Sequence, residues 1–83
     1  MPTTKPTPDE LRVSFAKNLT QQMAAFAERE GVTRHRAILK LSYEDGLDQS
    51  RLYAWMRGDG LPTLLHFMTL CHRFDVEPGD MFK

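Results

Sequence analysis

The sequence predicts an all-α fold, a compact bundle of about five helices. Apolar residues recur at spacings of three and four along most of the chain, which is the period of a helix with one buried face. No segment alternates apolar and polar residues over the length of a strand. Residues that start helices and glycines that stop them flank the periodic segments. These three observations predict helices throughout and no sheet.

The first helix is predicted to begin after Thr7 and to end at Gly31. Thr7 fits the N-cap, Pro8 fits the first helical position, and Glu10 stands where a capping box places its carboxylate. Glycine readily adopts the left-handed backbone that ends many helices, which makes Gly31 a suitable stop. The apolar residues at helical spacing in this segment are Leu11, Phe15, Leu19, Met23 and Phe26.

The second helix is predicted to begin after Thr33, which is its expected N-cap. The sequence leaves the end of this helix open. The segment Ser42–Gly46 either extends the helix or forms a longer turn, in which Gly46 supplies a left-handed backbone. The residues of this helix expected to face the core are Ala37, Ile38 and Leu41.

The third and fourth helices are predicted from an N-cap and a glycine break. The third begins after Asp48, which is a good N-cap, and ends at the break Gly58–Gly60. The fourth begins at Pro62-Thr63, and a last short helical turn over residues 76–82 is expected to close the core. The inward residues of the third helix are Leu52, Trp55 and Met56, and those of the fourth are Leu64, Phe67, Met68, Leu70, Cys71 and Phe74.

Length and composition exclude several classes of protein. A chain of 83 residues has room for one domain, which we expect over residues 7–83 after a disordered arm at residues 1–6. One cysteine allows no internal disulfide and no zinc ribbon. Because there is also no paired-carboxylate, Ser/His/Asp or phosphate-loop pattern, we expect no enzyme, metal or cofactor. No segment has the roughly 18 uninterrupted apolar residues of a membrane helix, so we expect a cytoplasmic protein with no membrane partner.

The distribution of charge is uneven although the net charge is zero. Residues 29–57 contain six basic and four acidic side chains, whereas residues 58–83 contain two basic and four acidic ones. The middle of the chain is therefore able to present a basic face, which is what nucleic-acid binding requires. An ordinary mixed-charge surface is the alternative.

The second and third helices predict a central helix-turn-helix, because the turn between them contains a glycine and the third helix is polar on its outer side. Its buried side carries Leu47, Leu52 and Trp55. Glutamine pairs with adenine, arginine pairs with guanine, and alanine contacts the thymine methyl group in the major groove of double-stranded DNA. The outer residues available for such contacts are Gln49, Ser50, Arg51, Tyr53 and Ala54.

A single register continues without gaps from Gly46 to Phe82, over 37 residues. It contains the run Gly46-Leu47-Asp48-Gln49-Ser50-Arg51-Leu52, then Arg57-Gly58, Pro62-Thr63-Leu64 and Asp80-Met81-Phe82. This order resembles the Cro/repressor-type helix-turn-helix family of phages, plasmids and bacteria, whose domains have the lambda-repressor-like fold. Gly31-Val32-Thr33 is similar to the start of the family's second helix.

The resemblance implies which side chains of the third helix contact DNA. Gln49, Ser50 and Ala54 match the family's base-reading positions, and Arg51 is the exposed position beside them. Arg57 matches the position that contacts phosphate at the end of the reading helix.

The phosphate contact of the second helix depends on the register. The family has a glutamine directly after the threonine that opens this helix. If Ser42–Asp45 are about four extra residues that lengthen the turn, this position is Arg34, with Arg36 as a further contact. Without the insertion the position is Ile38 and the contact is lost. Tyr53 replaces a small polar residue of the family and is expected to press on the DNA backbone.

The function implied by the resemblance is sequence-specific transcription regulation. We expect a repressor that occludes a promoter by binding a two-fold-related operator as a homodimer. The dimer surface is expected in the fourth helix with residues 76–82, or in the first helix. The alternative is an antitoxin or adaptor that uses the same fold to bind a protein partner, such as a toxin or a second repressor.

Overall fold

The computed structural model describes residues 5–83, which form four α-helices and one short 3-10 helix and contain no strand. This confirms the all-α class, while the fifth expected helix is the 3-10 segment. None of the helices within this part of the chain is long and apolar enough to cross a membrane. Of the predicted arm, residues 1–4 lie outside the described residues. The elements are α1 (Pro8–Glu30), α2 (Arg34–Asp45), α3 (Gln49–Met56), α4 (Leu64–Phe74) and η1 (Pro78–Phe82).

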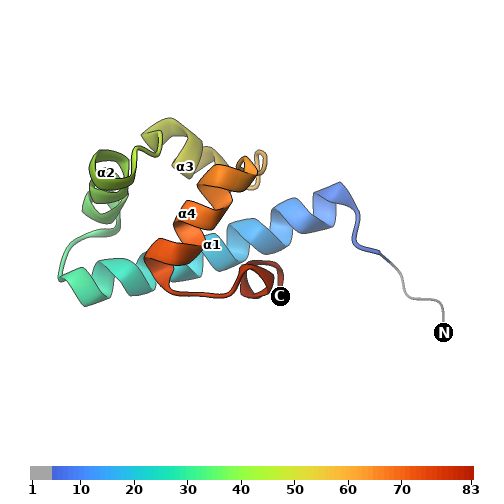
Figure 1. Cartoon of the computed structure of the whole chain (residues 1–83), viewed down its shortest axis with the longest axis horizontal. Coiled ribbons are helices and arrows are strands. Elements are labelled where there is room, and N and C mark those ends of the chain that lie inside the picture. The colour runs from blue at the N-terminus through green and yellow to red at the C-terminus, as the bar shows by residue number, and fades with distance from the viewer. Residues whose placement is uncertain (1–4) are drawn as a thin grey trace.

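The long helix α1 is the scaffold on which the other elements pack. It runs along the longest dimension of the molecule, and its N-terminal part extends past the other helices (Figure 1). Both predicted ends are confirmed: the Thr7 hydroxyl accepts a hydrogen bond from the Glu10 amide at 3.2 Å, and Gly31 ends the helix at φ 67°. α2, α3 and η1 all contact α1, so it shares one core with helices from both halves of the chain.

The segment Ser42–Asp45 belongs to α2, which ends at Gly46 with φ 69°. Of the two possibilities that the sequence leaves open, the extended helix is therefore correct and the longer turn is wrong. Four residues make slightly more than one helical turn, or about 6 Å along the helix axis. Adding them therefore leaves the buried and exposed faces of α2 in nearly the same orientation as in a helix without them. Arg73 of α4 holds this extra turn, with its guanidinium 2.7 Å from Glu44 Oε1 and 3.3 Å from Asp45 Oδ1.

The core is built from the buried stripe of α1 and the inner sides of the other elements. Phe15 of α1 meets the rings of Phe67 and Phe82 at centroid distances of 5.9 and 5.8 Å, and the latter two lie 5.5 Å apart. This cluster joins α1, α4 and η1, which is the closure that the sequence predicts for residues 76–82. The side chains that are almost completely buried are Phe15, Phe74, Leu19, Met23, Ile38, Leu41, Leu47, Leu52, Leu70 and Met81.

The apolar side of α4 is only partly buried. Leu70, Cys71 and Phe74 are in the core as predicted, whereas Leu64 is 74% exposed and Met68 is 45% exposed. The expectation that these two face the core is wrong, because little of the described chain covers the first turn of α4. The helix therefore presents apolar side chains to solvent at its N-terminal end.

Candidate nucleic-acid interface

The connection between α2 and α3 is the short segment Gly46–Asp48. Gly46 turns the chain in the left-handed conformation, which residues that have a Cβ atom rarely adopt. Leu47 is then buried in the core, and Asp48 caps α3 by accepting a hydrogen bond from the Arg51 amide at 3.1 Å. The turn is therefore held at three successive residues, and these fix the angle at which α3 leaves α2.

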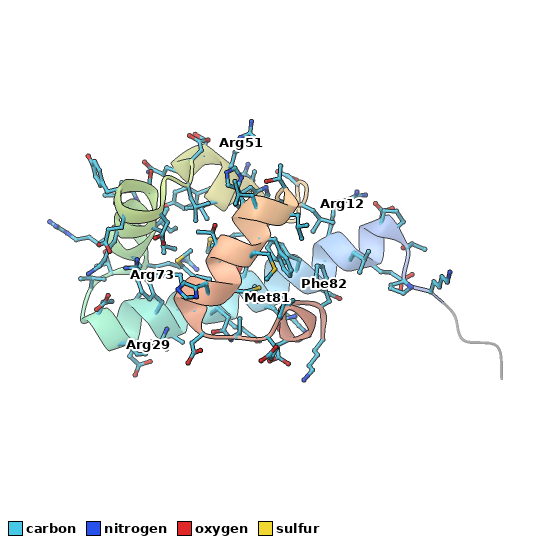
Figure 2. The ribbon with its side chains drawn as sticks, in the orientation of Figure 1. Arg12, Arg29, Arg51, Arg73, Met81 and Phe82 are labelled. Atoms are coloured by element: carbon cyan, nitrogen blue, oxygen red, sulfur yellow. The ribbon has the colours of Figure 1, made fainter. Side chains whose placement is uncertain are left out.

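The two sides of α3 differ in burial as the sequence predicts. Leu52 and Trp55 are buried and hold the helix against the core. Ser50 and Arg51 are exposed, and the Arg51 side chain projects away from the bundle (Figure 2). Of the other predicted base-reading residues, Gln49 and Ala54 are half-buried. All four predicted base-reading residues thus have at least part of their surface open to solvent.

A hydrogen bond joins the middle of α3 to the first turn of α2. The Tyr53 hydroxyl lies 2.7 Å from His35 Nδ1, and the two rings are nearly parallel, 6.3 Å apart at their centroids. The Tyr53 hydroxyl, predicted to press on the DNA backbone, is thus already engaged within the protein. Nothing local in the sequence pairs His35 with a residue 18 positions away, so the sequence pattern does not single it out.

The first turn of α2 carries two exposed arginines, Arg34 and Arg36, on either side of His35. Of the two residues that the sequence left open for the phosphate contact, Arg34 is exposed and Ile38 is fully buried. Only Arg34 has a side chain that is able to reach a ligand. Because the ring contact places His35 beside Tyr53, the N-terminal end of α2 and the outer side of α3 belong to one surface.

The predicted cations of this surface differ in how they are paired. Within residues 5–83 no ion pair involves Arg34, Arg36 or Arg51. The Nε atom of Arg57, by contrast, lies 3.0 Å from a carboxylate oxygen of Asp59, and both side chains are mostly exposed. An exposed pair of this kind is weak, so Arg57 is able to exchange Asp59 for another anion at little cost.

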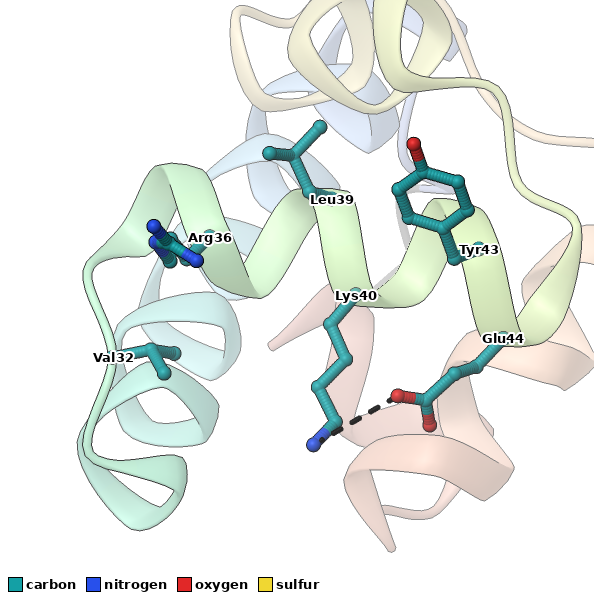
Figure 3. A pocket seen from close by; sticks show the side chains of 6 residues that line it. All are labelled: Val32, Arg36, Leu39, Lys40, Tyr43 and Glu44. Atoms are coloured by element: carbon teal, nitrogen blue, oxygen red, sulfur yellow. Dashed lines mark ion pairs between the residues drawn. The ribbon is translucent and has the colours of Figure 1, made fainter.

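An open groove of about 370 Å³ runs along the outer side of α2, lined by Arg36, Leu39 and Tyr43 among others (Figure 3). Lys40 lies within the groove, and its ammonium is 3.1 Å from Glu30 and 3.8 Å from Glu44. The pairing of Lys40 with two carboxylates leaves Arg36 as the unpaired cation of this groove. The groove therefore adds little positive charge to that of the first turn of α2.

The chemistry of the single cysteine is that of a core residue. Cys71 is buried, and burial raises the pKa of its thiol, with a smaller contribution from the charge of Glu77. A thiol with a raised pKa is a weak nucleophile at neutral pH. Among the described residues there is also no cluster of three or more His, Cys, Asp or Glu side chains that is able to hold a metal ion.

Comparisons of this chain with models of protein families, with curated proteins and with solved structures find no match. The resemblance to the Cro/repressor-type family therefore rests on the residues quoted above and stays a prediction.

Proposed function

We propose that this chain is a sequence-specific DNA-binding regulator whose helix-turn-helix consists of α2, the turn Gly46–Asp48 and α3. α3 enters the major groove with its N-terminal end, where Gln49, Ser50 and Arg51 reach base edges. Ala54, one turn further along, contacts a thymine methyl group. The first turn of α2 lies on the DNA backbone, and Arg34 and Arg36 contact phosphates.

The observation that carries this proposal is three exposed arginines, none in an ion pair among residues 5–83, in the first turns of the two helices that the Tyr53–His35 hydrogen bond joins. Arg34 and Arg36 flank His35, which is hydrogen-bonded to α3, and Arg51 is in the first turn of α3. Unpaired cations gathered in a molecule of zero net charge favour a polyanionic ligand. Gln49 and Ser50 in the first turn of α3 have uncharged hydrogen-bonding side chains, which suit base recognition better than simple charge attraction.

The regulation that best suits this domain is repression, because occluding a promoter requires only that the protein bind. A single domain of this size buries a limited surface on DNA, so a homodimer on a two-fold-related operator is expected. The half-sites are then about one helical turn apart.

The decisive experiment is the selection of bound fragments from a random pool of double-stranded DNA. We expect one enriched sequence motif with two-fold symmetry, since an isologous dimer presents α3 twice in related orientations. Failure to enrich any motif at low salt, with folded protein confirmed by circular dichroism, would contradict sequence-specific DNA binding.

The selected duplex also tests the phosphate contacts. Each lost phosphate contact lowers the slope of log affinity against log salt by about one unit, and we expect this of Arg34→Ala. Lys17→Ala is the matched control, because Lys17 is an exposed cation in the middle of α1, is in no ion pair among residues 5–83, and lies far along the chain from Arg34. Equal slopes for the two variants would remove Arg34 from the interface.

A protein-binding module is the second candidate function, and one observation favours it. Tyr43 is 87% exposed at the edge of the α2 groove, beside the half-buried Leu39. Aromatic side chains in such positions are common in protein interfaces. If the chain enriches no DNA motif but Tyr43→Ala abolishes binding to a co-purified protein partner, the antitoxin or adaptor function replaces the regulator.

A further inference from the structure

An uncharged apolar surface is exposed where the chain enters α4. It consists of Leu61, Leu64, Leu65 and Met68, which are 40, 74, 74 and 45% exposed. No Asp, Glu, Lys or Arg occurs anywhere between residues 61 and 71. We call these four residues the α4 patch. Soluble monomers rarely leave adjacent leucines so exposed, and contiguous apolar patches of several hundred Å² mark interaction sites.

We propose that the α4 patch is the surface through which two copies of this chain form an isologous dimer. In an isologous interface each residue near the two-fold axis meets its own counterpart, so any charge there would face an identical charge. The α4 patch meets this condition because its residues carry no formal charge. A partner chosen by charge would instead require a charged patch, and DNA would require a basic one.

The size of the patch suits the centre of a dimer interface. Four partly exposed apolar side chains form an apolar centre of a few hundred Å². A stable interface buries about 800 Å² on each partner and surrounds such a centre with a polar rim. Thr63 and His66 on the first turn of α4, and Asp59 in the preceding loop, are polar residues next in sequence to the patch and are able to form this rim.

The position of the patch also fits a dimer that binds DNA, and in this respect the inference rests on the proposed function. The loop that leads from α3 to the patch is tied to the end of α3, since the Asp59 amide donates to the Ala54 carbonyl at 2.9 Å. A two-fold axis through the α4 patch therefore places the two α3 helices on either side of it, as a two-fold-related operator requires. Within the C-terminal part of the chain, the exposure of the α4 patch favours the first turn of α4 as the dimer surface over residues 76–82, where Met81 is buried.

The test is sedimentation equilibrium of the full chain over a concentration series, without DNA. We expect a monomer–dimer equilibrium whose dissociation constant rises about 100-fold or more in Leu65→Lys, because the substitution places two like charges at the axis. Val13→Lys is the matched control, because Val13 is an apolar residue of α1 that is 67% exposed but lies outside the patch, and it should leave the equilibrium unchanged. A monomeric wild type, or equal effects of the two variants, would overturn the proposal.

A mixing experiment distinguishes loss of the dimer contact from loss of the fold, because only folded variants are able to pair with each other. Leu65→Lys and Leu65→Glu should each be monomeric, and an equimolar mixture should form heterodimers with a dissociation constant at least about 10-fold lower than that of either alone. No gain on mixing would overturn the isologous contact. A dimeric wild type that selects no DNA motif overturns the proposed function and supports the α4 patch, whereas a monomer that selects DNA overturns only the patch.

Discussion

Single residues at the N-terminal end of α3 differ in how much of the side chain is exposed. Ser50 and Arg51 are exposed, whereas Gln49 is half-buried next to the capping residue Asp48. A half-buried amide has fewer rotamers available, so it loses less conformational entropy when it makes two hydrogen bonds to one base. Of the predicted base-reading residues, Gln49 is therefore the one best prepared for bidentate recognition.

The Gln49→Ala variant tests this residue. We expect loss of discrimination at one or two base pairs of the selected duplex, worth roughly 1–3 kcal/mol, with unchanged affinity for duplexes that already differ at those pairs. The measurement is a fluorescence-anisotropy titration of duplexes substituted one base pair at a time. Gln21→Ala, which truncates an exposed glutamine of α1, should change none of these affinities. Equal weakening on every duplex would assign Gln49 to general affinity.

The sequence predicts the exposed positions of this surface but not its internal contacts. The helical period alone places Leu52 and Trp55 inward and Ser50 and Arg51 outward, since period and burial are local properties. The hydrogen bond between His35 and Tyr53 depends on the angle between two helices, which no local pattern specifies. The family resemblance also assigned Tyr53 to DNA, because it compares positions and carries no information on this pairing.

At the scale of elements, the last turn of α2 is stabilised by a contact between helices. Arg73 of α4 hydrogen-bonds to Glu44 and lies over the ring of Phe26, 5.3 Å from its centroid. This hydrogen bond is the main reason that the pKa of the Glu44 carboxyl lies below its ordinary value, and the charges of Arg73 and Lys40 act in the same direction. The sequence left Ser42–Asp45 open because this contact joins residues 29 positions apart.

The lowered pKa of Glu44 predicts a stability contribution that depends on pH. As pH falls, the unfolded chain takes up a proton at the ordinary glutamate pKa, roughly 4.3, before the folded chain does. Glu44 therefore stabilises the fold above this pH, and its contribution is lost as pH falls through the lower folded-state pKa. We expect the stability difference between wild type and Glu44→Gln, measured by urea unfolding, to shrink from about pH 6 to about pH 3. A difference that is constant over this range would contradict the ion pair.

The C-terminal end of α4 is a second element-scale feature, because its cap is a left-handed residue other than glycine. Asp75 is the one residue other than glycine among residues 5–83 with a positive φ, 57°. A left-handed backbone costs most residues about 1–2 kcal/mol, and an acidic side chain at a helix C-terminus opposes the helix dipole. We expect Asp75→Gly to raise the free energy of unfolding by about 0.5–1 kcal/mol, after the greater freedom of glycine in the unfolded chain is subtracted.

Thermal unfolding followed by circular dichroism measures this change, and the expected rise in Tm is a few degrees. Gly46→Ala is the matched control, because Gly46 has the same left-handed conformation with a similar φ of 69°. It should destabilise the protein by about 1 kcal/mol. If both variants lower Tm, the backbone conformation of Asp75 is not a source of strain.

The whole molecule is one core built along α1, and its closure depends on the last described residues of the chain. Met81 of η1 is completely buried, and Phe82 beside it packs on Phe15 of α1. The Asn18 side chain of α1 also donates a hydrogen bond to the Lys83 carbonyl at 3.0 Å, across 65 positions. Caps and helical periods predict each element from local sequence, and they also predict most of the residues that each helix buries. They do not predict which end of α4 is left exposed, because that depends on how far α1 and η1 extend beside α4.

Closure by η1 makes Met81→Ala a test of the whole fold. Removing a completely buried methionine side chain leaves a cavity and costs about 2–5 kcal/mol, a large part of the 5–15 kcal/mol that stabilises a typical domain. We therefore expect the urea midpoint of the whole cooperative transition to fall. Circular dichroism and Trp55 fluorescence should report the same loss of unfolding free energy, because Trp55 lies in the same core. Lys83→Ala, two residues away, removes only an exposed ion pair to Asp80 and should cost less than about 1 kcal/mol. If the Met81→Ala loss is as small as that of the control, or if the two probes separate, η1 is an appendage that the core does not need.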